Sequence, residues 1–417
     1  MTAISVIIPV YNVAPYITGC IGALKTQCFR DLEFIFVDDC STDKSMAAVE
    51  EFARTDPRVR ISRNRENIGP GLSRNRGIET ADGDYLSFID PDDSLAPDFY
   101  QLLYEKAVSG DFDIVKGSRV KVDPGSGRRQ PEKVNELIRT RMRQGEPLYF
   151  CFKRQHTTAI FRKCLFEDKR IRYGTGRSAE DTTFLLSVCK KTENIAFADP
   201  AIYYYHVRPG SRTSLFTEQR CRDELKSFSE KVDLLCLEKT DPFTVRYLEN
   251  ALSSYVSNIC QGMCEGLIPE ETEMDFVSFL REQLFRIPAW TQCKKSEYES
   301  SVLMDHQRLI PMINVKPRQF HCDRVRRWTD LLTACPETEA GYLLTGYDYA
   351  LLHALSSFLL HDPKSFFFSR NHFVFIKEQL ARLSPGLRKQ LIRNAGPAVK
   401  KLLAKLRDRM RYGTDFS

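Results

Sequence analysis

The sequence lacks any run of eighteen or more apolar residues, the length that a membrane-spanning helix needs. The nearest candidate, residues 342–360, is interrupted by Asp348 and His353. A strand-like pattern begins by Ile4, which leaves no room for a signal peptide. The 13 cysteines include no Cys-x-x-Cys pair, so neither a disulfide framework nor a zinc site is expected. These absences predict a protein of the reducing cytoplasm.

The length and charge of the chain limit its domain count and its partners. A chain of 417 residues with 42% hydrophobic and 28% charged residues is typical of a globular protein with two or three domains. Residues 382–411 hold ten Lys or Arg against one Asp, a net charge of +9. Because the whole chain carries +6, the rest carries about −3. The body of the protein is therefore not expected to bind nucleic acid.

Strand-like and helical segments alternate in the first hundred residues. The strands are expected at 5–10, 32–37, 59–61 and 85–89, and the helices at 14–28, 43–53 and 69–80. Further strands are expected at 113–117, 158–161 and 201–206, with a helix at 134–143. The pattern predicts an α/β fold with a mostly parallel sheet flanked by helices over residues 1–215. We expect residues 216–417 to form a second domain that is largely α-helical.

Carboxylates crowd the end of one expected strand. Asp90, Asp92 and Asp93 follow Phe88-Ile89, and like charges so close favour a cation. Oxygen ligands of this kind suit Mg²⁺ or Mn²⁺, although an acidic turn can also cap a following helix. The 11–12 and 38–39 segments follow two other strands. In open parallel sheets these strand ends share one edge, where ligands bind.

Four blocks carry a resemblance to a known family. Residues 6–12, 36–43, 67–78 and 83–93 resemble, in order and spacing, the family 2 glycosyltransferases with the GT-A fold. The resemblance covers residues 4 to about 215 and implies a metal-dependent enzyme with a nucleotide-sugar donor. Residues 216–417 resemble no family that we can name.

The resemblance assigns donor-binding roles to individual residues. It implies a nucleotide site made of Pro9, Tyr11, Asp39, Arg74 and Asp90. Tyr11 would stack on the base, Asp39 would accept the N–H of a uracil, and Asp90 would reach the ribose. Arg74 and its helix N-terminus would face phosphate. If no ligand binds, Tyr11 would be an aromatic residue at the edge of the site, Asp39 would cap a helix, and Arg74 would be a solvated surface residue.

The metal and the diphosphate are assigned to two further groups. The resemblance implies that Asp92 and His206 bind Mn²⁺ or Mg²⁺, and that Arg208, Ser211 and Arg212 close over the diphosphate as a lid. Many relatives have arginine where this chain has His206. If His206 is not a ligand, leaving-group stabilisation depends more on Arg212.

The catalytic pair is expected at the start of a helix near residue 180. Asp181 would be the general base and Glu180 would orient it or the acceptor, although acids also favour helix N-termini for electrostatic reasons alone. The implied reaction is inverting transfer of a sugar, with UDP as the expected carrier. Its acceptor is a hydroxyl of a glycan, a lipid-linked molecule or a cell-wall polymer. The alternatives are a catalytically silent nucleotide-sugar-binding scaffold and a nucleotidyltransferase of similar architecture.

The basic tail within 382–411 has helical periodicity. One face carries Val399, Leu402, Leu403, Leu406 and Met410, and lysines and arginines fill much of the remainder. Such a helix either docks on an anionic membrane surface or packs on its own domain. The first alternative predicts a peripheral location on the inner face of the cell membrane. The helical domain could also mediate homo-oligomer formation.

Overall fold

The structure, a computed structural model, describes residues 2–152, 154–208 and 217–235, with the short pieces 243–244, 247–248 and 251. The chain divides into two compact units. The first comprises residues 1–215 with 229–234, and the second comprises 216–228 with 235–417. The predictions of a helical second domain and of a basic amphipathic tail fall mainly or wholly outside the described residues.

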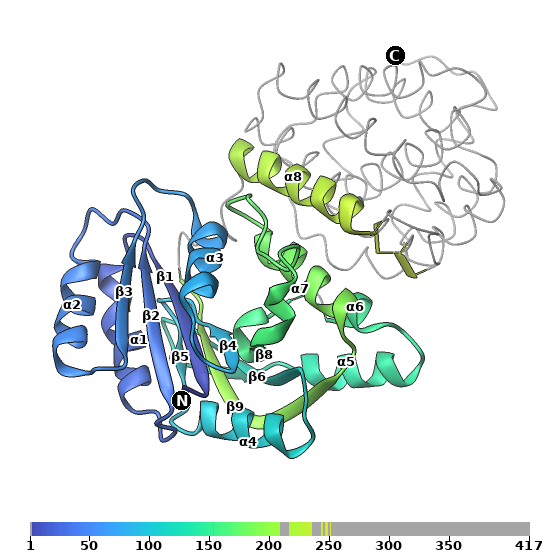
Figure 1. The fold of residues 1–417 in the computed structure, drawn as a ribbon, viewed down its shortest axis with the longest axis horizontal. Coiled ribbons are helices and arrows are strands. Elements are labelled where there is room, and N and C mark those ends of the chain that lie inside the picture. Colours follow the sequence, from blue (N-terminus) through green and yellow to red (C-terminus); the bar gives the residue numbers. More distant parts are fainter. Residues whose placement is uncertain are drawn as a thin grey trace, which may run out of the picture. The chain divides into compact units, whose positions relative to one another are not determined.

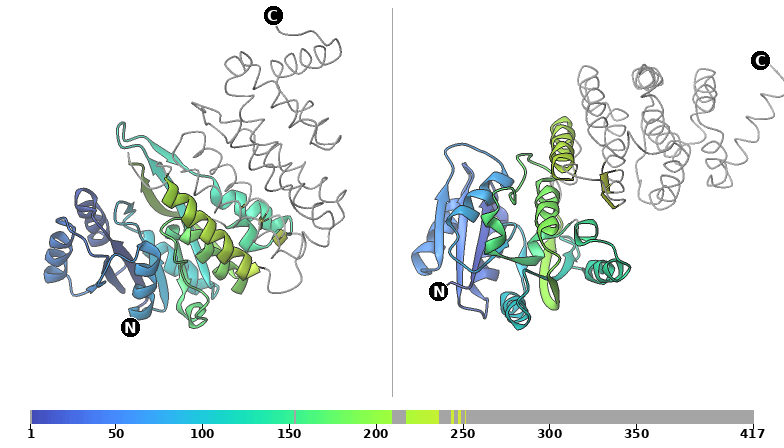
Figure 2. Two further views of the ribbon diagram at one scale, coloured as in Figure 1. Left: turned by 90° about the horizontal axis from the view of Figure 1, so that it is seen from above. Right: turned by 45° about the vertical axis from the view of Figure 1, so that its right-hand side comes forward.

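The first unit is built on a single mixed sheet (Figures 1 and 2). Its strand order is β3-β2-β1-β4-β8-β6-β9-β5, with β7 beside β6. The strands are β1 Ile4–Val10, β2 Leu32–Asp38, β3 Val59–Arg63, β4 Tyr85–Phe88, β5 Ser94–Leu95, β6 Ile114–Val122, β7 Arg129–Pro131, β8 Ala159–Arg162 and β9 Ile195–His206.

Helices from residues 1–215 flank this sheet, and one further helix is divided between the two units. The α-helices are α1 Ala14–Lys25, α2 Ser45–Thr55, α3 Pro70–Thr80, α4 Phe99–Ser109, α5 Val134–Arg143, α6 Leu148–Cys151, α7 Glu180–Lys191 and α8 Glu218–Leu235. Two short 3₁₀ helices, η1 His156–Thr158 and η2 Lys163–Glu167, flank β8. None of the helices in these described segments is long and apolar enough to cross a bilayer.

The predicted α/β sheet flanked by helices is confirmed, and its parallel part is the first half. β1 pairs in parallel with β2 and β4, and β2 with β3. Beyond β4 the sheet becomes mixed, because β8 runs antiparallel to both β4 and β6. The long strand β9 pairs in parallel with β6, with a register shift between Lys116 and Ser118.

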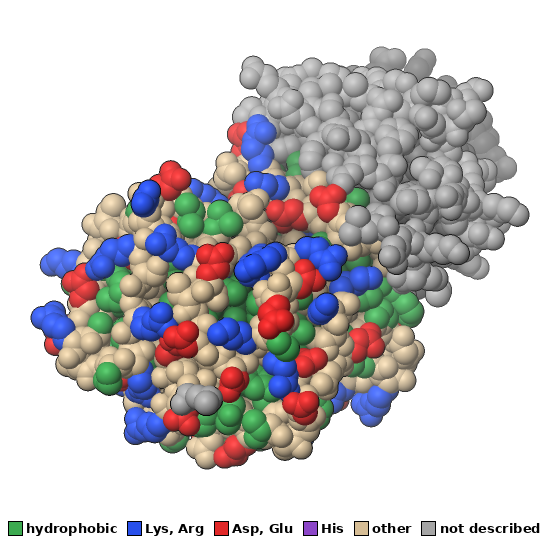
Figure 3. Space-filling model, in the orientation of Figure 1, with side chains coloured by type: hydrophobic (Ala, Val, Ile, Leu, Met, Phe, Trp, Pro, Cys, Tyr) green, Lys and Arg blue, Asp and Glu red, His purple; other side chains and the backbone are tan. Residues whose placement is uncertain are grey.

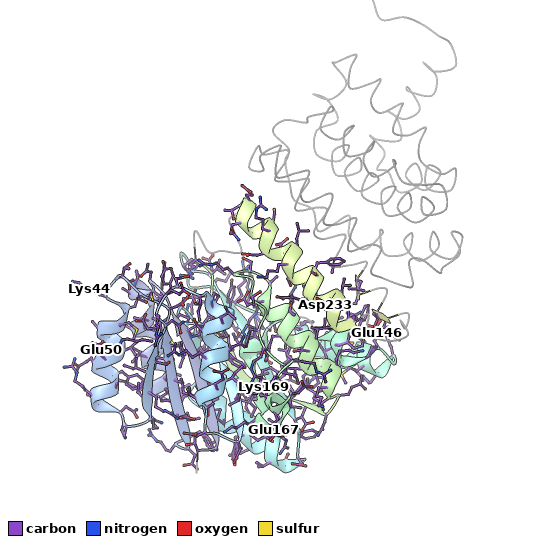
Figure 4. All side chains as sticks on the ribbon, turned by 45° about the horizontal axis from the view of Figure 1, so that its top comes forward. Lys44, Glu50, Glu146, Glu167, Lys169 and Asp233 are labelled. Atoms are coloured by element: carbon purple, nitrogen blue, oxygen red, sulfur yellow. The ribbon has the colours of Figure 1, made fainter. Side chains whose placement is uncertain are left out.

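Helices cover both faces of the parallel strands. One face of β1, with Val6, Ile8 and Val10, belongs to a core shared with buried residues of α1, α2 and α4. The apolar faces of these helices turn inward, whereas Lys44 and Glu50 project from the outer side of α2 (Figure 4). β1 is buried on both faces, as expected for a central parallel strand.

On the other face, helix α3 approaches β1 very closely. A Cβ atom added to Gly77 of α3 would lie 2.4 Å from Cγ2 of Ile7. Only a residue without a side chain fits there, and the resulting contact fixes the distance between α3 and the sheet. The placement of α3 matters because this helix also carries Arg74.

We expect Gly77→Ala to lower the free energy of unfolding by about 1–3 kcal/mol, because the added methyl group overpacks the contact with Ile7. Gly19→Ala is the matched control, since no atom lies within 4 Å of the added Cβ on α1. The control should raise stability by about 0.5–1 kcal/mol through its helix propensity. Urea unfolding of both variants checks this, and equal stability would contradict the observed packing of α3.

Candidate functional site

Polar residues gather where the parallel strands end. Asn12 after β1 and Cys40 after β2 have left-handed backbone angles, with φ of 49° and 63°. The Asn12 side-chain carbonyl accepts the Thr42 N–H at 2.8 Å, and the Val10 carbonyl accepts the Asp39 N–H at 2.8 Å. The two loops are therefore joined at one edge of the sheet, where ligands bind in folds of this type.

Asp39 organises the loop that leads into α3. This residue is 3% exposed. Its carboxylate accepts N–H bonds at 2.8 Å from the Asn64 side chain and from the backbone of Ile68 and Gly69. Since a carboxylate offers about four acceptor positions, these three bonds leave one for a base N–H. Asp39 therefore has a structural role in this loop, and its recognition of a base stays a prediction.

Two other nucleotide candidates lie at the end of β1. Pro9 is buried within the strand, opposite Val37 of β2. Tyr11 follows the strand and is 38% exposed, so its ring is accessible for stacking. The structure thus places Tyr11 at the sheet edge and Pro9 behind it, and their contacts with a nucleotide stay predictions.

The acidic turn after β4 is anchored by Asp93. Its carboxylate accepts the Tyr203 hydroxyl at 2.6 Å and the His206 backbone N–H at 2.9 Å. Burial and then the charges of Asp90 and Asp92 raise the pKa of Asp93 well above its usual value. Asp93 therefore ties the turn to the end of β9. It does not cap the next helix, which begins only at Phe99.

Asp92 faces a cationic side chain. Burial and then the charge of Asp90 raise its pKa, and Arg208 opposes the shift. Arg208 Nε lies 2.7 Å from an Asp92 carboxylate oxygen, and its guanidinium lies 5.1 Å from the centre of the Tyr16 ring. The chain thus supplies a positive charge of its own to the acidic turn.

His206, the other predicted metal ligand, is engaged elsewhere. Its Nε2 lies 2.8 Å from the Ser94 hydroxyl oxygen. Burial and then the nearby charge of Arg129 lower the pKa of His206, so the ring is neutral near pH 7. Its role as a ligand stays a prediction. Two lid residues, Ser211 and Arg212, lie outside the described residues.

The acidic turn fits a divalent ion that is shared with a substrate. Among the residues that the structure describes, no group of three or more His, Cys, Asp or Glu side chains is arranged to hold a metal. Mg²⁺, however, is usually held by one or two carboxylates together with substrate phosphates. Asp92 and the neighbouring Asp90 offer such oxygens, and the charge of Asp90 adds to the effect of burial in raising the pKa of Asp92.

Arg74 joins this turn to the start of α7. Its guanidinium donates to Asp90 at 2.6 Å and to Glu180 at 3.1 Å, and it lies 5.2 Å from the centre of the Tyr173 ring. The side chain is almost completely buried. Although burial opposes the charge, Asp90 in particular raises the pKa of Arg74. Two acidic motifs that are far apart in the sequence therefore contact the same arginine side chain.

The closeness of α3 and α7 depends on a second glycine. A Cβ atom on Gly71 would lie 2.8 Å from the Gly174 carbonyl oxygen and 2.9 Å from Cγ of Glu180. The glycine of the predicted phosphate-facing turn thus also makes room for the start of α7. Arg74, three residues later, reaches Glu180 because of this approach.

Glu180 and Asp181 have different surroundings. Glu180 is buried, and burial raises its pKa to about 7 although Arg74 opposes the shift. The Asp181 side chain is 31% exposed. Its pKa is lowered, because His156, Arg74 and Lys231 together outweigh the effect of burial. Asp181 is therefore ionised at neutral pH and accessible, whereas Glu180 is held inside.

The sequence analysis missed His156, the neighbour of Asp181. His156 Nδ1 lies 3.7 Å from an Asp181 carboxylate oxygen, and the histidine is 5% exposed. Its ring packs near Tyr173 and Phe184, with ring centres 5.5 and 6.2 Å away. A single histidine before a short strand carries no pattern that sequence reasoning could have used.

Residues of α8 that belong to the first unit also reach this region. The Thr175 N–H donates to Glu230 at 3.2 Å, in the loop before α7. The charge of the buried Lys231 contributes to lowering the pKa of Asp181. The sequence analysis expected no site residue from this helix.

The charged side chains on the face shown in Figure 3 are of both signs. Lys and Arg alternate there with Asp and Glu over the described part of the chain. This face therefore has no basic stripe of the kind that nucleic-acid-binding proteins present.

Comparisons with known proteins indicate a family for the amino-terminal residues. Residues 5–169 match the model of glycosyl transferase family 2. The chain is 28% identical over 288 residues to glycosyltransferase GlyA of Streptococcus pneumoniae, covering 66% of this chain and 40% of that protein. It is 33% identical over 224 residues to the uncharacterized glycosyltransferase EpsJ of Bacillus subtilis, covering 51% and 63%. The matches thus span less than two thirds of either relative.

The fold itself matches a solved structure. The crystal structure of Staphylococcus aureus TarS residues 1–349 in complex with UDP-GlcNAc superposes with a TM-score of 0.54 at 20% identity. The match covers 83% of this chain and 91% of that one, and it shows the GT-A fold. With the family match, the related glycosyltransferases and this fold in agreement, residues 5–169 are identified as a glycosyl transferase family 2 domain.

Proposed function

We propose that this glycosyltransferase inverts the anomeric carbon of a sugar as it moves that sugar from a nucleotide donor to an acceptor hydroxyl. The observation that carries the proposal is the position of Arg74, which contacts the turn that would hold the donor diphosphate and the helix that carries Asp181. A donor on one side of Arg74 and a base on the other are the two requirements of a direct displacement.

The donor that we propose is a UDP-linked sugar. Tyr11 offers an accessible ring for a base, and Asp39 keeps one acceptor position for the N–H of uracil. The TarS structure that shares this fold contains UDP-GlcNAc. Asp90 would receive the ribose, with Pro9 behind the base and Arg74 near the phosphates.

The acceptor that we propose is a hydroxyl group of a glycan, a lipid-linked molecule or a cell-wall polymer. A TarS protein that is 30% identical over 226 residues is named a poly(ribitol-phosphate) beta-N-acetylglucosaminyltransferase, which supports a polymer. The basic tail would bring the enzyme to the inner face of the membrane if the acceptor is bound to lipid.

Asp181 is the general base of the proposed reaction. Its accessible carboxylate takes the proton of the acceptor hydroxyl while that oxygen bonds to the anomeric carbon. The bond from this carbon to the diphosphate oxygen breaks in the same step, and the nucleoside diphosphate leaves. A single displacement, with attack from the side opposite the leaving group, inverts the configuration at the anomeric carbon. Glu180, held by Arg74, orients the start of α7.

The negative charge of the leaving group needs stabilisation. Asp92, with His206 as the second predicted ligand, would hold Mg²⁺ or Mn²⁺, and the ion would neutralise charge on the leaving diphosphate. The Arg208 guanidinium, which now pairs with Asp92, would turn to the diphosphate once the ion has taken its place. Ser211 and Arg212 would complete the lid with Arg208.

We expect Asp181→Asn to lower the transfer rate about 10²–10⁴-fold, because the amide cannot accept the proton. Binding of UDP, measured by calorimetry, should remain as in the wild type. Glu51→Gln, which changes an exposed acid on α2, is the control and should transfer normally. Full activity of Asp181→Asn would rule out Asp181 as the base, and inactivity of the wild type with every nucleotide sugar would favour a scaffold.

Replacing Arg74 by methionine should cost about 3–5 kcal/mol of stability and most of the activity, because two carboxylates lose their shared partner. Adding Glu180→Gln to Arg74→Met removes one of the unpaired charges. The double variant should therefore recover part of the stability in urea unfolding without recovering transfer. Independent, additive effects of the two changes would contradict direct coupling between Arg74 and Glu180.

Removal of divalent metal with EDTA should abolish transfer, and Mn²⁺ should restore it. In Asp92→Asn, the Mn²⁺ concentration that gives half-maximal activity should rise at least about tenfold, as after damage to a metal site. Asp98→Asn, an exposed acid six residues later, is the control and should respond as the wild type does. Undiminished activity in EDTA would exclude a metal role for Asp92.

A further inference from the structure

We propose that His156 is a positioning residue that orients the Asp181 carboxylate for proton abstraction. This inference rests on the proposed role of Asp181. It is argued from the contact between the two side chains, from the surroundings of the imidazole and from the way the backbone at His156 is held.

The contact has one chemically sensible polarity. An ionised carboxylate only accepts hydrogen bonds, so the Nδ1 that faces Asp181 at 3.7 Å must carry the proton. The distance is longer than a hydrogen bond, as is common for catalytic contacts before the substrate arrives. A small rotation of the Asp181 side chain, which is partly exposed, would close it.

The surroundings of Nε2, the other ring nitrogen, indicate that histidine at this position does not favour the stability of the fold. Nε2 of His156 is buried and has no hydrogen-bond partner, which destabilises the folded state. The ring lies among aromatic side chains, near Phe88, Tyr173 and Phe184. A phenylalanine would suit this pocket better than a histidine does. A polar ring kept in an apolar pocket points to a task at its one engaged nitrogen.

The backbone that carries His156 is held rigidly. The preceding Gln155 has a left-handed φ of 70°, and its side-chain carbonyl accepts a bond from the buried Lys116 ammonium at 3.0 Å. The same ammonium donates to the Thr158 hydroxyl at 2.7 Å. Gln155, just before η1, and Thr158, its last residue, are therefore both joined to β6, so the backbone that carries the imidazole is held on each side of His156.

Other charges also act on Asp181. Arg74 on α3 and Lys231 on α8 favour its ionised form, as His156 does. Two other titratable groups lie close to it, Glu180 before it on α7 and Tyr173 on the neighbouring loop. Among these groups His156 has the largest effect in holding the pKa of Asp181 down. All the others are unchanged in a variant of His156, so a variant isolates its contribution.

Two variants separate positioning from packing. His156→Phe keeps an aromatic ring and removes the donor, whereas His156→Asn keeps a donor close to the place of Nδ1 and removes the ring. We expect His156→Phe to keep or raise the melting temperature, to lower kcat at least about tenfold and to leave the donor KM unchanged. We expect His156→Asn to retain more activity than His156→Phe despite a lower melting temperature.

The pH profile gives a readout that a packing role would not move. The base must be ionised, so the rate falls as the pH drops through the pKa of Asp181. Without His156 that pKa rises, and the acidic limb of kcat in His156→Phe should move up by about one pH unit. An unmoved limb, or a His156→Phe variant as active as the wild type, overturns the proposal.

A measurement without turnover separates this inference from the proposed function. The carboxyl carbon of Asp181, assigned by its loss in Asp181→Asn, can be titrated by NMR in ¹³C-aspartate-labelled full-length protein. A higher pKa in His156→Phe than in the wild type supports the inference even if no donor is turned over. Equal pKa values overturn it even if the enzyme is an active glycosyltransferase.

Discussion

One buried guanidinium holds the site together. Arg74 is surrounded by protein, and the free-energy cost of burying its charge is offset because it pairs with two carboxylates and lies near an aromatic ring. The carboxylates come from the turn after β4 and from the first turn of α7, which are 90 residues apart in the sequence. No other described contact joins these two acidic motifs directly, and the glycines at 71 and 77 allow α3 to come close enough to make it.

A second link ties the far half of the sheet to the same turn. Asp93 accepts hydrogen bonds from the hydroxyl of Tyr203 and the backbone N–H of His206, so the acidic turn is joined to the end of β9. Three carboxylates in four positions thus have three different environments. One pairs with Arg74, one pairs with Arg208, and one is consumed in building the site.

The sequence allowed the parallel half of the fold to be predicted closely, because buried parallel strands read as continuous apolar runs and the helices between them have clear periodicity. The 134–143 helix was expected with its observed bounds. The strands of the mixed half were harder, since β9 contains Asp199 and Pro200 and the two-residue β5 has no pattern at all. The acidic motifs were visible as clusters of one residue type. Arg74 was expected to face phosphate, and its pairing with Glu180 depends on a contact between distant segments that no local pattern shows. His156 was missed for the same reason.

The ion pair between Asp92 and Arg208 gives the acidic turn an internal counter-charge. Because this arginine reduces the repulsion between the neighbouring carboxylates, the charge balance of the turn does not depend on a bound ion alone. An ion that bound Asp92 would compete with Arg208 for the same carboxylate, so its apparent affinity would include the cost of breaking this pair.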